Sequence, residues 1–415
     1  MAAQKSYKSM VCPFCSLHCD DLIIETSDNN IRLTQGNPEC GKKISRHNIN
    51  SQSRTSATIN KKKTGLTEAL KKVKKIIEKK SEVLILNHGT DLSGLRSLLT
   101  FASKYHCIID HITSKFLFQN IGIVQRTGYI ATSLMETKNR ADTIIIFGNN
   151  ILKKNPRLLD RILIPDASLC VNPKKKNIIL VGSFDKNTIN SISRKSNAIN
   201  VRIKLDNIPD FLKIINNNKS ETLRFITKQS LVKINSIIKK SKYLVSTWTA
   251  SDFSNTKNPE DIISSISKFI VDLNITSRAA CMPISGPLAD STSAQALTWL
   301  TGFPSRIKYS NNSFKHNRTA YNSEKLIENK QVDTVIHVSN LSENELIMNK
   351  NIYNIVLGHP NSKLNIEPDI FIPIGIPGLD HEGIMFRTDN VVSVALKSVR
   401  KLKLPSTQTI FNKLI

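Results

Sequence analysis

The sequence predicts an α/β protein built on parallel β-sheets, and two observations carry that prediction. Short runs that are apolar throughout, such as EVLILN at 82–87 and TIIIF at 143–147, recur along the chain. Segments with apolar residues at helical spacing separate these runs. Strands that are apolar on both faces are typical of parallel sheets covered by helices on both sides. The length of 415 residues suits two or three domains of this kind.

The individual elements follow from the same patterns in chain order. Leu66, Leu70 and Val73 recur at helical spacing among lysines, which predicts a helix over 66–79 ahead of the strand at 82–87. The same reasoning predicts further helices near 92–104, 131–140, 221–240, 258–273 and 291–300. It predicts further strands at 22–25, 107–112, 143–147, 178–181, 243–246, 333–338, 354–357 and 369–373.

Two turns that follow predicted strands are candidate ligand sites, because ligands bind parallel sheets beyond the carboxyl ends of the strands. The turn after TIIIF makes Gly148 and Asn149 candidate cofactor-binding residues. The Gly-rich loop at 375–383 follows the run DIFIPI and brings in Glu382 and Arg387 as further candidates. A surface loop closed by a Glu382–Arg387 ion pair is the alternative for this second turn.

The first 60 residues differ from the rest of the chain because four of its seven cysteines, Cys12, Cys15, Cys19 and Cys40, are crowded there. Thiolates supply a soft ligand shell for iron or zinc. Three ligands from one loop and a fourth from a distance fit a [4Fe–4S] cluster better than the paired knuckles of structural zinc sites. Zinc remains an alternative, and so does a metal-free loop held by packing of Phe14 and its apolar neighbours.

The net charge and the absence of long apolar segments indicate which partners and which cellular compartment to expect. Lys and Arg outnumber Asp and Glu by 59 to 33, a net charge of +26 that attracts polyanions such as acidic subunits or polycarboxylate cofactors. No nucleic-acid-binding module is recognisable, so we expect no nucleic acid partner. The N-terminus lacks an apolar signal region, and no apolar run approaches the ~18 residues of a membrane span. We therefore expect a cytoplasmic protein without a membrane contact.

Four blocks in collinear order carry a resemblance to a known family. They are the head CPFCSLHCDDL with the distant Cys40, RTGYIATSLMETKNRADTIIIFGNNILKKNPRLLDR at 126–161, QALTWLTGFPSRIKYSNNSFKHNRTAY at 295–321 and IPGLDHEGIMFRTDNV at 376–391. Together they resemble the B subunit of formylmethanofuran dehydrogenase, a molybdopterin oxidoreductase, and in particular the B subunits of bacterial formyltransferase/hydrolase complexes. The resemblance covers nearly the whole chain.

The resemblance implies a Cys-rich head followed by Rossmann-like parallel-sheet domains of the molybdopterin oxidoreductase type. We divide the chain into a head at 1–60, an α/β domain made of 61–140 and 310–415, and a second α/β domain inserted between them at 141–309. The loop with Glu382 and Arg387 is implied to face the pterin pocket.

For the dehydrogenase, the resemblance implies a [4Fe–4S] cluster on Cys12, Cys15, Cys19 and Cys40. It also implies tungsten or molybdenum between two pyranopterins, held by a Cys or selenocysteine that should fall at 110–125. That stretch has no cysteine. The apolar residues around its Ser114 indicate a segment packed in the hydrophobic core. We therefore expect the W/Mo-bis-pterin group to be absent and assign this chain no catalytic residue.

The resemblance then implies a degenerate scaffold subunit in a formyltransferase/hydrolase complex, which takes part in the methanofuran- and tetrahydromethanopterin-dependent oxidation of formaldehyde to formate. The expected partners are a formyltransferase, a zinc hydrolase and a further structural subunit. The complex would handle a methanofuran-type cofactor whose polyglutamyl tail could meet the positive charge of this chain. The alternative is an active formylmethanofuran dehydrogenase subunit that binds W/Mo-pterin and a [4Fe–4S] cluster.

Overall fold

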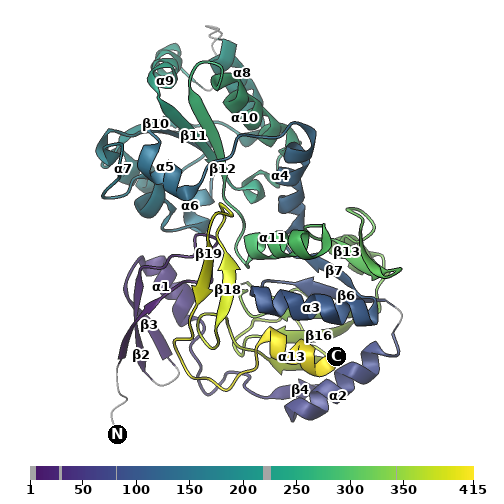
Figure 1. Cartoon of the computed structure of the whole chain (residues 1–415). Coiled ribbons are helices and arrows are strands. Elements are labelled where there is room, and N and C mark those ends of the chain that lie inside the picture. The colour runs from purple at the N-terminus through teal and green to yellow at the C-terminus, as the bar shows by residue number, and fades with distance from the viewer. Residues whose placement is uncertain (1–5, 28–29, 81, 218–225, 343) are drawn as a thin grey trace. The chain divides into compact units, whose positions relative to one another are not determined.

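The structure is a computed structural model that describes residues 6–27, 30–80, 82–217, 226–342 and 344–415 (Figure 1). The chain divides into two compact units, of which unit 1 comprises Met1–Ser114 with Pro287–Ile415, and unit 2 comprises Lys115–Gly286. These units do not have the limits 141 and 309 that we expected for the inserted domain. Within the described residues, no helix is long and apolar enough to cross a membrane.

The head of unit 1 is a small antiparallel sheet with one helix. The sheet has the order β1 (Ser6–Met10), β2 (Leu22–Ser27) and β3 (Asn30–Gln35), and α1 (Pro38–Ser45) follows it. Helix α1 begins where Asn37 accepts a hydrogen bond from the Glu39 amide and Pro38 presets the first helical φ. Leu22, Ile24 and Ile44 are buried, so sheet and helix share a small core.

The main sheet of unit 1 has nine strands. Their order is β14 (Ser313–His316), β13 (Ile307–Ser310), β7 (Ile108–His111), β6 (Val83–Asn87), β15 (Thr334–Ser339), β16 (Tyr353–Gly358), β17 (Ile370–Pro373), β4 (Ala57–Ile59) and β5 (Lys62–Thr64). The strands from β7 to β17 pair in parallel, and the outer pairs are antiparallel. The predicted parallel sheet is confirmed, with antiparallel edges that the sequence analysis did not anticipate.

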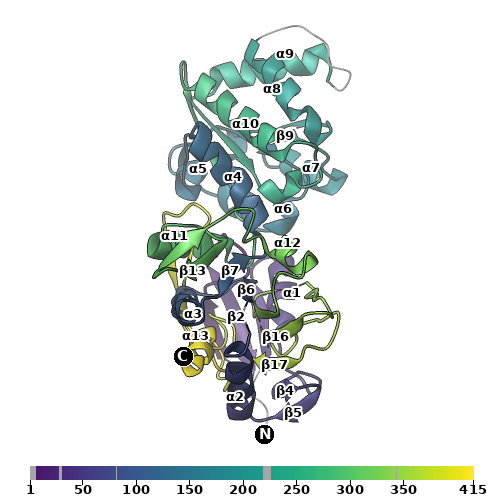
Figure 2. The ribbon, with the colours of Figure 1, turned by 90° about the vertical axis from the view of Figure 1, so that its right-hand side faces the viewer.

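Helices cover both faces of this sheet. The helices α2 (Leu66–Ile77), α3 (Leu92–Tyr105) and α13 (Thr407–Leu414) lie on one face and α12 (Ser323–Glu328) on the other (Figure 2). Along β6, Ile85 packs into the core of the first face, whereas Leu84 and Leu86 pack into the core of the second. Two-sided burial explains why the strand sequences are apolar throughout.

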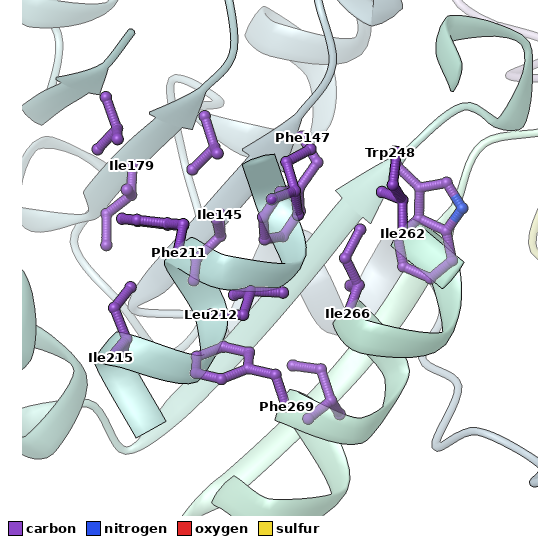
Figure 3. Packing of buried hydrophobic residues seen from close by; sticks show 14 of the residues in the cluster. Ile145, Phe147, Ile179, Phe211, Leu212, Ile215, Trp248, Ile262, Ile266 and Phe269 are labelled. Atoms are coloured by element: carbon purple, nitrogen blue, oxygen red, sulfur yellow. The ribbon is translucent and has the colours of Figure 1, made fainter. Parts of the chain in front are cut away.

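Unit 2 is a five-stranded parallel sheet. Its order is β10 (Asn197–Val201), β9 (Asn177–Val181), β8 (Thr143–Phe147), β11 (Tyr243–Trp248) and β12 (Arg278–Pro283). Phe211 on α8 (Ile208–Asn217) and Phe269 on α10 (Pro259–Leu273) belong to the same buried cluster as Ile145 and Ile179 of the sheet (Figure 3). Other helices of unit 2 are α5 (Leu134–Arg140), α6 (Ile151–Lys154), α7 (Lys186–Ser193) and α9 (Lys228–Lys240).

Further segments also differ from the sequence expectations. The stretch expected to be core filling forms α4 (Ser114–Arg126), in which Phe118 and Ile123 are buried. Helix α9 begins at Lys228, whereas part of the helix expected near 221–240 lies outside the described residues. The tail forms an unexpected hairpin of β18 (Gly383–Phe386) and β19 (Ser393–Leu396), and the Phe386 amide donates a hydrogen bond to Thr292 on α11 (Asp290–Thr301).

Candidate functional site

The four head cysteines lie in a buried part of unit 1. Cys12, Cys15 and Cys19 belong to the cysteine loop, residues 11–21 between β1 and β2, and Cys40 lies on α1. The structure describes all seven cysteines of the chain, and none of them forms a disulfide. The loop is closed by backbone hydrogen bonds from Cys12 to Cys19, 2.9 Å, and from His18 to Cys15, 3.1 Å. The sequence thus builds a short loop that keeps its thiols away from water.

The four thiols influence one another electrostatically. Burial raises the pKa of Cys12 well above its ordinary value, and the neighbouring Cys15, Cys19 and Cys40 raise it further. Burial, followed by the charge of Cys19, raises the pKa of Cys15 to about 12. Cys12 and Cys15 are therefore protonated in the unliganded chain, and they would deprotonate only for a positively charged group that they bind together. Among the described residues, no set of three or more His, Cys, Asp or Glu side chains is arranged to hold a single metal ion.

His18 supports the cysteine loop from within. Its ring is buried, and its Nδ1 donates a hydrogen bond to the Cys12 carbonyl oxygen at 2.9 Å. Burial lowers the pKa of His18 to about 4, and the positive charge of Arg387 contributes to the lowering. A neutral His18 that is committed to a backbone carbonyl is a packing residue of the loop.

The turn that contains Gly148 and Asn149 is filled by a carboxylate of the same unit. Asp252 has a fully buried side chain whose Oδ2 accepts hydrogen bonds from the amides of Asn149 and Asn150, at 3.0 and 2.8 Å. Its Oδ1 lies 2.8 Å from the Lys154 ammonium. The two amides and the ammonium that surround this carboxylate are the donors that an anionic ligand would need at this strand end. Asp252 satisfies them, so the predicted cofactor-binding turn is internally occupied.

Substitution of Gly148 by alanine is expected to destabilise unit 2 by about 1–3 kcal/mol. Gly148 has a φ of +122°, and a Cβ there would lie 2.5 Å from Oδ2 of Asp252. Urea unfolding monitored by circular dichroism should show the loss. Gly122→Ala is the matched control, because a Cβ on this helical glycine meets its first neighbour at an ordinary 3.6 Å. Equal unfolding midpoints for the two variants would contradict the tight packing of Asp252 in the turn.

The tail loop does not form the Glu382–Arg387 pair that was the alternative for it. Glu382 is exposed, and its carbonyl oxygen accepts a hydrogen bond from Nδ1 of His381 at 2.8 Å. Arg387 is buried and lies 3.4 Å from Asp389. The amide of Thr388 donates to the Ser16 carbonyl oxygen at 2.9 Å, so Arg387 is held beside the cysteine loop.

The predicted site residues therefore form separate groups. Arg387 and the cysteine loop are brought together in unit 1. Glu382 is also in unit 1, but it points to solvent. Gly148 and Asn149 belong to unit 2 and enclose Asp252. The predicted site residues are therefore considered as separate candidate sites, one group at a time.

The residues at the expected heavy-metal ligand position have other partners. Ser114 is buried at the start of α4, and its Oγ accepts a hydrogen bond from Nε of Arg306 at 3.2 Å. Arg306 also lies 3.5 Å from the buried Asp110. Cys107 is fully buried just before β7 in the hydrophobic core of unit 1. Neither Ser114 nor Cys107 is available as a soft, exposed ligand for a heavy metal.

The sequence analysis missed a row of histidines at the carboxyl ends of the parallel strands of unit 1. His111 ends β7, His88 follows β6, His337 lies near the end of β15, and His359 follows β16. All four are buried. Their regular position, within two residues of the end of each predicted strand, was the available signal.

The comparisons with known proteins give relatives in sequence and in structure. No family model matches the chain. The B subunit of the tungsten-containing formylmethanofuran dehydrogenase 2 of Methanococcus maripaludis is 21% identical over 95% of this chain and 94% of its own length. The protein of the same name from Methanocaldococcus jannaschii is 20% identical over 93% and 92%.

The structural comparison gives a match in fold. A chain in the crystal structure of the formyltransferase/hydrolase complex (FhcABCD) from Methylorubrum extorquens, solved in complex with methylofuran, matches with a TM-score of 0.72. The match is 14% identical in sequence and covers 86% of this chain and 97% of that one. It establishes a shared fold. Together, the comparisons show that this chain is similar in sequence to B subunits of formylmethanofuran dehydrogenase and similar in fold to a chain of the formyltransferase/hydrolase complex.

Proposed function

We propose that this chain is the B-type subunit of a formyltransferase/hydrolase complex that acts in methanofuran-dependent one-carbon oxidation. The observation that carries the proposal is the agreement of two full-length comparisons, one with the B subunit of formylmethanofuran dehydrogenase and one with a chain of the FhcABCD complex. In this role the chain works with a formyltransferase, a zinc hydrolase and a further structural subunit. The finer architecture in this proposal is that of the molybdopterin oxidoreductases, in which a Cys-rich head is followed by Rossmann-like parallel-sheet domains.

In this proposal the subunit has lost its own redox chemistry. The residues present do not fit a tungsten or molybdenum centre, because residues 110–125 contain no cysteine and Ser114 is bound by Arg306. The turn after β8 in unit 2 does not fit an anionic cofactor either, because its backbone amides already donate hydrogen bonds to Asp252. The chain then contributes a scaffold, and formyl transfer and hydrolysis take place on its partners.

The surface charge suggests one contact with the cofactor of the complex. The methylofuran found in the related complex belongs to a cofactor class in which we expect a polyglutamyl tail. A chain with a net charge of +26 would attract such a tail over the distance of a Debye length, about 8 Å at physiological ionic strength.

Two measurements on the complex test this function. Affinity purification of the chain from its native cells should recover formyltransferase and hydrolase subunits at constant ratio, and anaerobically prepared complex should contain neither tungsten nor molybdenum in stoichiometric amount. The relatives' names favour the second candidate, an active tungsten-dependent dehydrogenase subunit. Stoichiometric tungsten together with a pterin fluorescence signal would establish that candidate and end the scaffold proposal.

The head has a proposed role of its own, as the binding site of a [4Fe–4S] cluster on Cys12, Cys15, Cys19 and Cys40. Burial and mutual repulsion disfavour four free thiolates, so a bound cluster would stabilise the loop that holds them. Such a cluster would supply one-electron transfer in an active relative and a structural clamp in this chain. Zinc and a metal-free loop are the competing states.

Replacing Cys40 by serine is expected to abolish cluster binding, because a harder oxygen replaces one of four thiolates. Iron and labile sulfide should fall from about four of each per chain to near zero after anaerobic reconstitution. Cys107→Ser is the matched control, since Cys107 is equally buried but lies in the core beside β7. Iron-free wild-type protein with stoichiometric zinc would instead assign zinc to the head, and wild-type protein free of both metals would leave it as a packing motif.

A further inference from the structure

A small polar pocket lies at the carboxyl end of β16 in unit 1, where His359 meets the segment after α1. Its volume is about 210 Å³. The residues that line it are Arg46, His47, Ser342, His359, Asn361, Ser362 and Lys363. Two of them are cations and none is an acid, so the lining favours an anion.

His359 gives the pocket a buried hydrogen-bond donor without an acceptor. Its Nδ1 accepts a hydrogen bond from the amide of Asn361 at 3.1 Å. A neutral imidazole that accepts at Nδ1 carries its proton on Nε2. Only 2% of His359 is exposed, and Nε2 has no hydrogen-bond partner among the described residues. A buried donor of this kind is normally paired, so its partner is expected to come from a ligand.

The pocket is held in shape before any ligand binds. The Asn361 side-chain amide donates to the carbonyl oxygens of Arg46 and Asn48 at 3.0 and 2.6 Å, which ties the loop after β16 to the segment after α1. The His47 ring stacks on Phe14 at 4.7 Å and meets the edge of the His359 ring at 4.9 Å. Because these contacts fix the walls, a ligand would lose little free energy in ordering them.

We propose that this pocket binds a phosphate group, either as the free ion or as a monoester on a larger molecule. Nε2–H of His359 would donate to one phosphate oxygen, while Arg46 and Lys363 would supply positive charge at the mouth. An arginine fork pairs with two oxygens of a phosphate at once, and a tetrahedral anion has a further oxygen for the imidazole. A carboxylate has too few oxygens for the same set of donors. The inference does not depend on the proposed function of the complex.

The test measures binding of inorganic phosphate and of glycerol 3-phosphate to the full-length chain by calorimetry, with ionic strength held constant by sodium chloride. His359→Asn keeps an acceptor where Nδ1 lies but removes the Nε2 donor, so its dissociation constant should rise at least about tenfold. His359→Gln restores a donor near Nε2 and should recover most of the affinity. Lys363→Gln should weaken binding several-fold.

The matched control is Lys71→Gln, which removes one charge from an exposed position on α2 and should leave the affinity unchanged. Tighter binding of glycerol 3-phosphate would assign the site to a monoester, and tighter binding of inorganic phosphate would assign it to the free ion. The proposal is wrong if neither ligand binds beyond the effect of sodium chloride. It is also wrong if acetate binds as tightly as phosphate, or if His359→Asn and Lys363→Gln bind like the wild type.

Discussion

Lowering the pH from 7 to 5 is expected to destabilise unit 1 strongly while leaving unit 2 almost unaffected. All nine histidines of the chain lie in unit 1, and none lies between residues 115 and 286. Burial lowers the pKa of His47 and of His337 to about 4. Burial lowers the pKa of His88 and of His359 further below the ordinary value, and nearby imidazoles contribute in both cases.

The direction of the effect follows from proton uptake. In the unfolded chain these imidazoles protonate near pH 6.5. In the folded chain His47 and His337 stay neutral until about pH 4, and the pKa values of His88 and His359 also lie well below the ordinary value. Above pH 6.5 the histidines therefore do not reduce the free energy of unfolding of unit 1. As the pH falls from there toward 4, each histidine lowers that free energy by up to about 1.4 kcal/mol per pH unit. His18, whose pKa burial also lowers to about 4, adds to the effect. Asp91, whose pKa is raised by burial, works in the opposite direction, but a single carboxyl does not offset five imidazoles.

Hydrogen–deuterium exchange at several pH values would measure this effect for each unit separately, with the histidine-free unit 2 as internal control. A variant identifies the groups responsible. The ring of His88 lies with Nε2 3.4 Å from Nδ1 of His337, whose own Nε2 lies 3.3 Å from Oδ1 of Asn354. His88→Gln keeps a donor toward His337 but no longer titrates, so the proton uptake on unfolding should fall by about one. Parallel acid profiles for the two units would refute the assignment.

Asp380→Ala is expected to lower the free energy of unfolding of unit 1 by about 3–5 kcal/mol, because it leaves a buried arginine without its counter-charge. The side chains of Asp380 and Arg400 are both fully buried, with Oδ1 and Nε 2.6 Å apart. Asp380 also accepts the amide of Ile376 at 2.8 Å, and Arg400 donates to the His47 carbonyl oxygen at 2.6 Å. The pair thus joins the tail loop to the segment after α1.

A double-variant cycle distinguishes the lost pair from lost packing. Arg400→Met removes the other charge and keeps most of the side-chain volume, so the double variant Asp380→Ala/Arg400→Met should be more stable than the sum of the single losses predicts. Unfolding by urea at pH 7 is the measurement. Strict additivity would mean that the two side chains act independently despite their contact.

The strands of this protein could be predicted from sequence, because a strand buried on both faces has an unmistakable apolar run. Both TIIIF and the EVLILN run became central strands of their sheets. The antiparallel edge strands could not be found in this way, since β14 and β5 carry polar residues that face water. Helix α4 was missed because its apolar residues were read as filling rather than as a periodic face.

The candidate site was predictable only where its residues are adjacent in sequence. The cysteine spacing already indicated a loop, and the structure places those cysteines in one. The occupant of the Gly148 turn comes from a residue about a hundred positions away, Asp252, and no local pattern announces that contact. Arg387 likewise meets the cysteine loop through tertiary packing across almost the entire length of the chain.

The split of unit 1 across the sequence governs the order in which the protein can fold during synthesis. Strand β6 pairs with β15, and α3 receives α13, whose Phe411 ring lies 5.0 Å from that of Phe101. The ribosome therefore releases the apolar strands and helix of the first hundred residues long before their partners emerge. Unit 2, which is continuous, has all of its strands available earlier. We therefore expect the nascent N-terminal segment to need protection from aggregation, for instance by a chaperone, until translation is nearly finished.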